Sequence, residues 1–302
     1  MAAASSMKST NVRVLRTFLR VADVVAPGLA GRAATDLWFR LPPALRPAPV
    51  PPGGEPFEVT SLGAKVRGRV WGGDGPVVYL VHGWGGRGDQ LAGYVQPLLD
   101  RGHRIVMFDG PAHGLSDPGP SAPTTNGLEF GRALDAVGSR FGPARAVVAH
   151  SMGAAATVLT LKYGWLSTER LVLLAPMVRL SSSLDDYQRM VGLGSRGRRR
   201  MDREILRRVG LPVPEFDLSV LTEQVDPVPT LVVHDRRDRQ TPYTESARLA
   251  EGMPQARFLG TEGLGHRRVL SDPAVTDAVV GFVDTGELAV ERGGDLVLAE
   301  SA

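Results

Sequence analysis

A serine stands where an apolar run turns into an alanine-rich run in the segment VVAHSMGAAA, residues 147–156. Ser151 has Ala149 two positions before it and Gly153 two positions after it. A strand that passes directly into a helix through one residue holds that residue in a strained conformation, and bulky neighbours would collide across the turn. The helix that follows directs its free N–H groups and the positive end of its dipole at the reacting group. The pattern therefore predicts a nucleophilic serine.

A serine nucleophile needs a general base and an acid that orients this base, and here both should follow it after later strands. The segment LVVHDRRDRQTP (231–242) ends an apolar run with two aspartates, Asp235 and Asp238. The segment TEGLGHRRVL (261–270) offers His266 in a glycine-flanked loop. The order Ser, Asp, His fits the arrangement, and the residues alone leave open which aspartate is the acid.

A glycine-rich turn follows another apolar run in YLVHGWGGRGD (79–89). Such a turn can direct the backbone N–H of Trp84 at an oxygen that becomes negative during acyl transfer, with the N–H of Met152 as second donor. The histidine spacings match no H-x-x-x-H or HExxH pattern, and no GK[ST] follows the turn, so we predict neither a metal site nor a P-loop. The chain has no cysteine, which excludes a thiol nucleophile and disulfides.

The elements that must position these residues are short apolar runs alternating with helical segments. We expect strands at 57–60, 65–71, 77–81, 104–108, 144–149, 171–174, 230–234 and 257–259, and helices at 89–100, 124–138, 152–164, 243–252 and 273–284. Continuous apolar runs are typical of parallel strands covered on both faces, while the first two runs fit an antiparallel edge pair. The alternation predicts a mostly parallel, eight-stranded α/β sheet with helices on both faces.

Changes in composition along the chain predict how it is divided into parts. The predicted parts are an N-terminal helical extension with a proline-rich linker (1–55), an α/β core (56–176 and 230–284), a polar, arginine-rich helical lid insertion (177–229) and a loosely attached tail (285–302). The lid carries the main basic cluster, at 194–208, which we interpret as a solvated face. Recruitment of an anionic substrate, carrier or membrane is the alternative.

The N-terminal segment 12–25 places Leu15, Phe18, Leu19 and Ala22 at helical spacing, with arginines on the other face. We expect this helix to dock on the protein body. A peripheral membrane-surface helix and an organelle-targeting peptide are the alternatives. No apolar run reaches the roughly 18 residues of a membrane span, and a cytoplasmic location is expected. Basic residues without aromatic stacking partners predict no nucleic-acid partner.

These segments together resemble the α/β-hydrolase superfamily, and specifically its serine-dependent esterases and lipases. The resemblance covers roughly residues 57–284 and rests on HGWGG, FDGPAHGLSD, AHSMGA, HDRRD and GLGH. It implies the α/β-hydrolase fold, with Ser151 as nucleophile and His266 as base. It prefers Asp238 as the acid, because family members often carry the acid three residues after a Gly, and Asp235 takes the position of that Gly.

The resemblance also implies that the Trp84 and Met152 N–H groups form the oxyanion hole, and that other histidines in these motifs (His82, His113 and His150) shape turns by hydrogen bonding. The implied function is hydrolysis of a carboxylic ester or thioester of a small-molecule acyl substrate through an acyl-enzyme, without metal or cofactor. A serine nucleophile argues against dehalogenase and epoxide hydrolase chemistry, which uses aspartate in this fold. An acyltransferase, and a non-catalytic member that binds a small molecule or a protein, are the alternatives.

Overall fold

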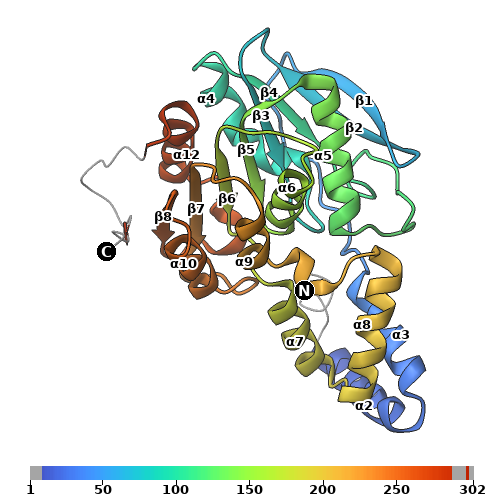
Figure 1. The fold of residues 1–302 in the computed structure, drawn as a ribbon. Helices are drawn as coiled ribbons and strands as arrows, with labels where there is room; N and C mark the ends of the chain where they lie inside the picture. The colour runs from blue at the N-terminus through green and yellow to red at the C-terminus, as the bar shows by residue number, and fades with distance from the viewer. Residues whose placement is uncertain (1–8, 288–296, 299–302) are drawn as a thin grey trace.

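A mixed β-sheet forms the centre of the structure, a computed structural model that describes residues 9–287 and 297–298 (Figure 1). The strand order is β1-β2-β4-β3-β5-β6-β7-β8-β9. The strands are β1 Glu55–Ser61, β2 Ala64–Trp71, β3 Val77–Val81, β4 Arg104–Phe108, β5 Ala144–His150, β6 Leu171–Leu174, β7 Thr230–Asp235, β8 Ala256–Thr261 and β9 Val297–Leu298. All eight predicted strands form, and β3 to β8 are parallel.

The edges of the sheet are antiparallel. The predicted edge pair is confirmed, because β1 pairs antiparallel with β2, and β2 pairs antiparallel with β4. The other edge carries a ninth strand that we did not predict: the two residues of β9, in the C-terminal tail, pair antiparallel with β8. The remainder of the tail from residue 288 onward, and residues 1–8 of the N-terminal extension, lie outside the described residues.

Helices cover both faces of the sheet, which explains the continuous apolar runs of its strands. Tyr79 and Val81 of β3 pack in one core with helices on one face, whereas Val78 and Leu80 pack in a second core on the other face. The first core includes α5 Gly127–Phe141, α6 Met152–Lys162 and α10 Tyr243–Glu251, and the second includes η1 Gly88–Tyr94, α4 Val95–Leu99 and α12 Pro273–Thr285.

Two local predictions were wrong. The helix expected over 89–100 is divided into the 3₁₀ helix η1 and the five-residue α4. Pro97 lacks the N–H that would bond to Gly93 four residues earlier, so a continuous α-helix cannot form there. His266 lies in a one-turn helix, α11 Gly265–Arg268, instead of a loop. One turn is too short to produce a recognisable apolar period.

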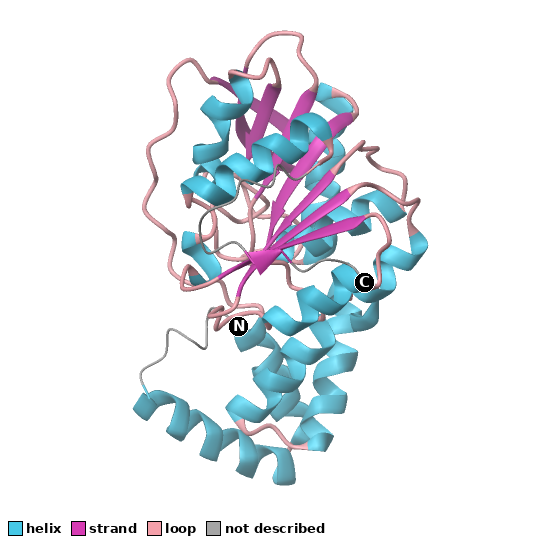
Figure 2. Ribbon diagram, turned by 90° about the vertical axis from the view of Figure 1, so that its left-hand side faces the viewer, coloured by secondary structure: helices cyan, strands magenta, loops and turns pink. Residues whose placement is uncertain are grey.

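Four helices pack together beyond one end of the sheet, and we call them the helical cluster (Figures 1 and 2). They are α2 Ser9–Val25 and α3 Pro27–Trp38 from the N-terminal extension, and α7 Leu180–Val191 and α8 Ser195–Val209 from the insertion. The close approach of α3 and α8 depends on glycine, because a Cβ on Gly31 would lie 2.7 Å from the Gly197 carbonyl oxygen. The extension and the insertion thus form one unit, which no sequence pattern indicated.

The α2 helix packs on the other three helices of this cluster through a narrower face than expected. Leu19 is buried and Asp23 accepts a hydrogen bond from the Gly197 N–H of α8, but Phe18, expected in the buried stripe, is exposed. From the insertion, the chain returns to β7 through η2 Val213–Phe216, α9 Leu218–Leu221 and η3 Thr222–Gln224. Among the described helices, none combines the length and the apolar character needed to cross a bilayer.

Candidate active site

Ser151 occupies the junction between β5 and α6, in the turn that its neighbours predicted. Its φ of 54° and ψ of −121° put it in a backbone region that side chains rarely adopt. Its N–H donates to the Leu174 carbonyl at 3.0 Å, which ties the turn to β6. A Cβ on Gly153 would lie 2.4 Å from the His82 carbonyl oxygen, and Ala149 is completely buried. Small residues are therefore required on both sides of the serine.

The structure brings Ser151, His266 and Asp238 together. Nε2 of His266 lies 3.1 Å from Ser151 Oγ, and Nδ1 of His266 lies 2.6 Å from Asp238 Oδ2. The three residues follow β5, β8 and β7, and the carboxyl ends of these parallel strands meet at one edge of the sheet. Because a carboxylate only accepts hydrogen bonds, Nδ1 carries the proton and Nε2 directs its lone pair at the serine hydroxyl.

The Asp238 carboxylate is completely buried and held by several donors. The N–H groups of Gln240 and Thr241 donate to Oδ1 at 2.6 and 3.1 Å, and the Thr241 hydroxyl donates to Oδ2 at 3.0 Å. Burial by itself raises the pKa of Asp238, but the hydrogen bonds from His234 and His266 outweigh it and hold the pKa well below the usual range. Asp238 is therefore ionised at neutral pH.

Asp235, the other candidate acid, has a different set of partners. It accepts hydrogen bonds from the Arg237 N–H at 2.9 Å, and from the Thr261 hydroxyl and the Leu264 N–H at 2.8 Å each. Leu264 directly precedes the helix that carries His266. Asp235 thus joins the end of β7 to the segment before His266, and both of its carboxylate oxygens accept hydrogen bonds in that role.

His234 is a supporting residue that the sequence analysis missed. Its Nε2 lies 3.2 Å from Asp238 Oδ2, and its Nδ1 lies 2.6 Å from the hydroxyl of Ser246 in α10. The ring therefore donates to the carboxylate and accepts from the serine hydroxyl, so His234 holds Oδ2 of Asp238 while the backbone donors hold Oδ1. The available signal was a histidine at the strand end, four residues before the aspartate.

Two buried histidines fix the glycine-rich turn beside Ser151. The Gly110 N–H donates to Nε2 of His82 at 2.9 Å, and the Gly85 N–H donates to Nε2 of His113 at 2.8 Å. Nδ1 of His82 lies 2.7 Å from the Gly83 carbonyl, and Nδ1 of His113 lies 2.9 Å from the Pro111 carbonyl. Each neutral ring donates once and accepts once, so the expected hydrogen-bonding role of these histidines is confirmed.

Burial keeps these rings neutral. It lowers the pKa of His82 to about 4 and that of His113 to about 3, because a charged imidazole would lose its hydration. His150, whose Nε2 lies 3.1 Å from the His266 carbonyl, is also buried, and burial lowers its pKa well below the usual value. A proton on His82 or His113 would also occupy the nitrogen that accepts a backbone N–H.

The predicted oxyanion donors lie beside the serine. Trp84 lies in the turn that the Gly86 N–H closes onto the Gly83 carbonyl at 3.0 Å. Met152 is the first residue of α6, and the first N–H groups of a helix have no partner within it. Both residues line the same pocket as Ser151 and His266.

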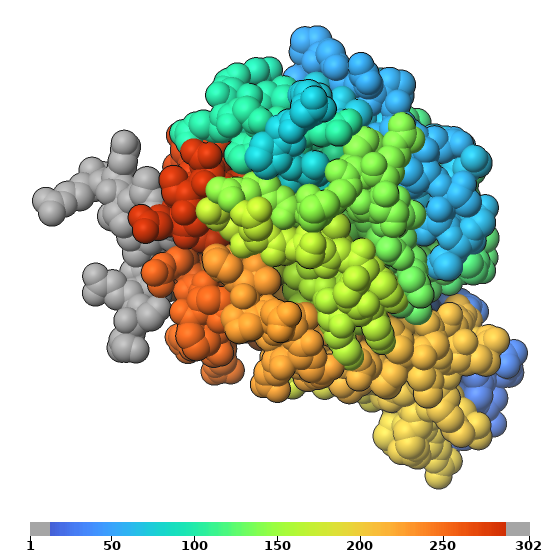
Figure 3. Space-filling view, turned by 45° about the horizontal axis from the view of Figure 1, so that its top comes forward, coloured from blue at the N-terminus to red at the C-terminus, as the bar shows by residue number. Residues whose placement is uncertain are grey.

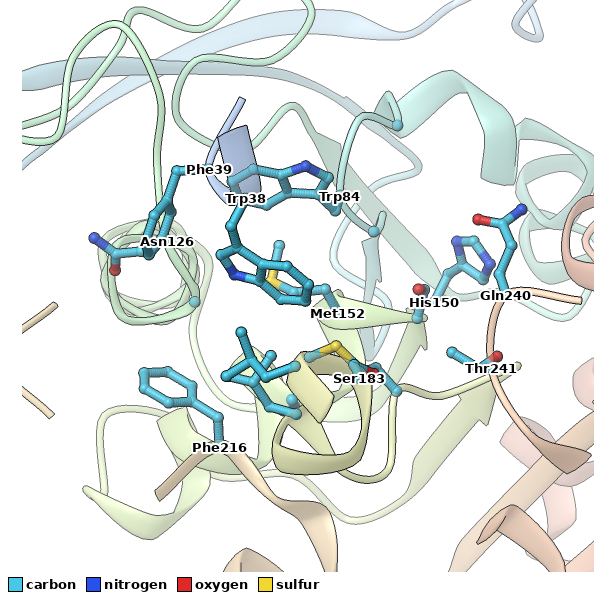
Figure 4. A pocket seen from close by; sticks show the side chains of 18 of the residues that line it. Trp38, Phe39, Trp84, Asn126, His150, Met152, Ser183, Phe216, Gln240 and Thr241 are labelled. Carbon is cyan, nitrogen blue, oxygen red and sulfur yellow. The ribbon is translucent and has the colours of Figure 1, made fainter. Parts of the chain in front are cut away.

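This pocket lies between the carboxyl edge of the sheet and the helical cluster, and its walls are mostly apolar (Figure 4). The core contributes Trp84 and Met152, and Met177 lies at the first position of the insertion. The cluster and the segments that adjoin it contribute Trp38, Phe39, Leu180, Leu184, Ile205, Val209 and Phe216. The N-terminal extension and the insertion thus both help to enclose the space in front of Ser151. Among the residues that the structure describes, no group of three or more His, Asp or Glu side chains could hold a metal ion.

Comparisons with known proteins agree with this fold. A family model described as alpha/beta hydrolase family matches residues 78–279. An esterase from Pyrococcus furiosus is 17% identical and superposes with a TM-score of 0.61, over 82% of this chain and 97% of its own. An esterase from Rhodococcus sp. is 17% identical, with a TM-score of 0.57 over 77% of this chain and 99% of its own.

The thioesterase domain from the curacin biosynthetic pathway is 17% identical, with a TM-score of 0.57 over 77% of this chain and 100% of that domain. At these identities the likeness demonstrates the fold. No curated protein matches the chain.

Proposed function

The chain belongs to the alpha/beta hydrolase family, and on that premise we propose that it is a serine hydrolase that cleaves a carboxylic ester or thioester. The observation that carries the proposal is the hydrogen-bonded line from Asp238 through His266 to Ser151, with separations of 2.6 and 3.1 Å, at the end of an apolar pocket. Nucleophile, base and orienting acid are the groups that acyl transfer requires.

In the proposed reaction, Nε2 of His266 takes the proton of the Ser151 hydroxyl while Oγ of Ser151 attacks the acyl carbonyl carbon. Asp238 keeps the proton of the ring on Nδ1 and stabilises the imidazolium that forms. His266 then gives the proton to the departing alcohol or thiol. Water, activated by the same ring, releases the acid from Ser151.

We assign the backbone N–H groups of Trp84 and Met152 to the developing oxyanion. Donors of this kind contribute about 2.7–4 kcal/mol each to transition-state stabilisation, so the turn that holds Trp84 must be rigid. The hydrogen bond that His113 accepts from the Gly85 N–H, and the one that His82 donates to the Gly83 carbonyl, supply that rigidity. A peptide group anchored in this way needs no reorganisation as charge develops.

The pocket supports a substrate with an apolar acyl or alcohol part. Its walls are aromatic and aliphatic, and such surfaces favour apolar groups that leave water. We assign the insertion 177–229, together with the end of α3, the role of a lid over this pocket. Phe216 and Ile205 from the insertion side would then contact the substrate.

The test is hydrolysis of p-nitrophenyl esters with increasing acyl length and of an acyl thioester, with the released acid identified by mass. We expect turnover by the wild type, and loss of about 10⁴-fold or more in kcat on Ser151→Ala. The matched control is Ser139→Ala, because Ser139 is exposed on α5. Unchanged hydrolysis by Ser151→Ala, or none by folded wild type on any of these substrates, would contradict the proposal.

A further inference from the structure

The outer face of α2 carries a row of exposed apolar side chains, which we call the α2 ridge: Val14, Phe18, Val21 and Val25. Their spacing of four, three and four residues places them on one side of the helix. Their exposed fractions run from 60% to 75%. Most of the large apolar side chains exposed in the described part of the chain belong to α2 and the start of α3. An apolar row of this kind on a surface marks an interaction site.

Arginines adjoin the α2 ridge. Arg13 and Arg20 are exposed on one flank of α2, and Arg16 is exposed farther round the helix, beside Gly192 of the turn between α7 and α8. Within residues 9–287 none of the three forms an ion pair. A hollow between the start of α3 and α8 is lined by further basic residues, Arg32, Arg200, Arg203 and Arg207, together with Leu29. Figures 1 and 2 place α2 at the end of the helical cluster farthest from the sheet, and Figure 3 shows α8 and the blue N-terminal helices protruding there.

We propose that the α2 ridge and its arginines dock the protein on the surface of an anionic membrane. A helix with an apolar row beside arginines lies in the interface plane, with its apolar side chains among the acyl chains and its cations at the headgroups. Here the helix is already folded and fixed by the burial of Leu19, so docking orders few residues. The net charge of +3 adds a long-range attraction to an anionic surface.

A membrane fits this surface better than a second copy of the chain. A copy that used the same face would bring its own Arg13 and Arg20 close to these arginines, and like charges would repel. Anionic phospholipids supply both the counter-charge and an apolar layer. The inference does not depend on the proposed hydrolase function, since α2 lies outside residues 78–279, which match the family.

The test is co-sedimentation of the full chain with vesicles of phosphatidylcholine, with or without about one-third phosphatidylglycerol. We expect the protein to sediment with the anionic vesicles, to remain in solution with pure phosphatidylcholine, and to dissociate as salt is raised. A wild type that stays in solution with both vesicles at low salt would overturn the proposal, as would equal binding to both.

The apolar contribution is tested with Phe18→Ser/Val21→Ser, which changes two exposed side chains and so should leave thermal unfolding unchanged. We expect this variant to lose at least tenfold in vesicle affinity. The control is Leu62→Ser/Leu115→Ser, because these side chains are equally apolar and exposed but lie on the core. Equal loss in both variants would contradict a specific role for the α2 ridge.

The charge contribution is tested with Arg13→Gln/Arg20→Gln, against Arg248→Gln/Arg257→Gln as a control of the same net charge on exposed positions of the core. We expect the first pair to weaken binding roughly 25-fold, about fivefold for each arginine, and the control to bind like wild type. Sedimentation velocity on the same samples identifies a different occupant. A dimer that dissociates on Phe18→Ser/Val21→Ser and ignores vesicles would assign the α2 ridge to a second copy.

Discussion

Replacing His82 by asparagine should change how the stability of the protein depends on pH. In the folded protein this ring is buried, accepts the Gly110 N–H and has its pKa lowered to about 4. In the unfolded chain its pKa is about 6.5. Between these values the unfolded chain takes up a proton that the folded chain refuses. The free energy of unfolding contributed by His82 is therefore fully present above pH 6.5 and falls as the pH is lowered toward 4.

The magnitude follows from the two pKa values. Each pH unit inside the window removes up to about 1.4 kcal/mol, so that His82 costs the folded state about 2 kcal/mol between pH 7 and pH 5. The asparagine variant does not titrate there, but it leaves the Gly110 N–H without its partner, at about 1–3 kcal/mol at every pH. The wild type should be more stable at pH 7, and the difference should shrink by about 2 kcal/mol at pH 5.

The assay is urea unfolding of both proteins at several pH values from about 7 to about 5. Val137→Ala, which removes apolar volume from the buried face of α5 and adds no titrating group, should lower stability by the same amount at each pH. If the difference between wild type and His82→Asn stays constant within about 0.5 kcal/mol across the range, the ring does not reside in the folded protein as a buried neutral acceptor.

Three further predictions concern the site. Asp238→Asn should lower kcat by about 10⁴-fold, because an amide no longer fixes the tautomer of the His266 ring. Asp235→Asn should mainly lower the melting temperature. Equal losses in kcat for the two variants would contradict the assignment of Asp238 as the acid. Gly153→Ala should lower the free energy of unfolding in urea by about 1–3 kcal/mol or more, since its Cβ would lie 2.4 Å from a backbone oxygen. Gly281→Ala in α12, where a Cβ would meet nothing within 4 Å, should leave that free energy unchanged or raise it. Phe216→Ala should shift ester preference toward longer acyl chains, and an unchanged chain-length profile would place the acyl group elsewhere.

The strands were predictable because most are buried on both faces, and their apolar runs end within two residues of the observed ends. The glycine-rich turn and the small residues beside Ser151 were predictable for a related reason, since backbone crowding permits few residue types. The N-terminal extension was different. Nothing in its composition indicated that α3 packs on α8 or that Trp38 and Phe39 reach the pocket, because such contacts depend on the shapes of distant segments.

The acid illustrates a second limit. Asp235 and Asp238 lie at the end of the same strand, and only the path of the turn decides which carboxylate reaches His266. The exposure of Phe18 could not be predicted for a similar reason, because a helix with apolar residues on two sides does not reveal which side docks. Periodicity identifies the helix, and tertiary packing selects the face.

The most direct test of the proposed function is covalent labelling of the folded protein with a fluorophosphonate, read by intact mass and peptide mapping. We predict one adduct, on Ser151, that is absent from Ser151→Ala and strongly slowed in His266→Ala. Ser183→Ala, which removes a serine of the same pocket, should be labelled like the wild type. Absence of an adduct on folded wild type, or an adduct that persists in Ser151→Ala, would contradict an activated serine at this site.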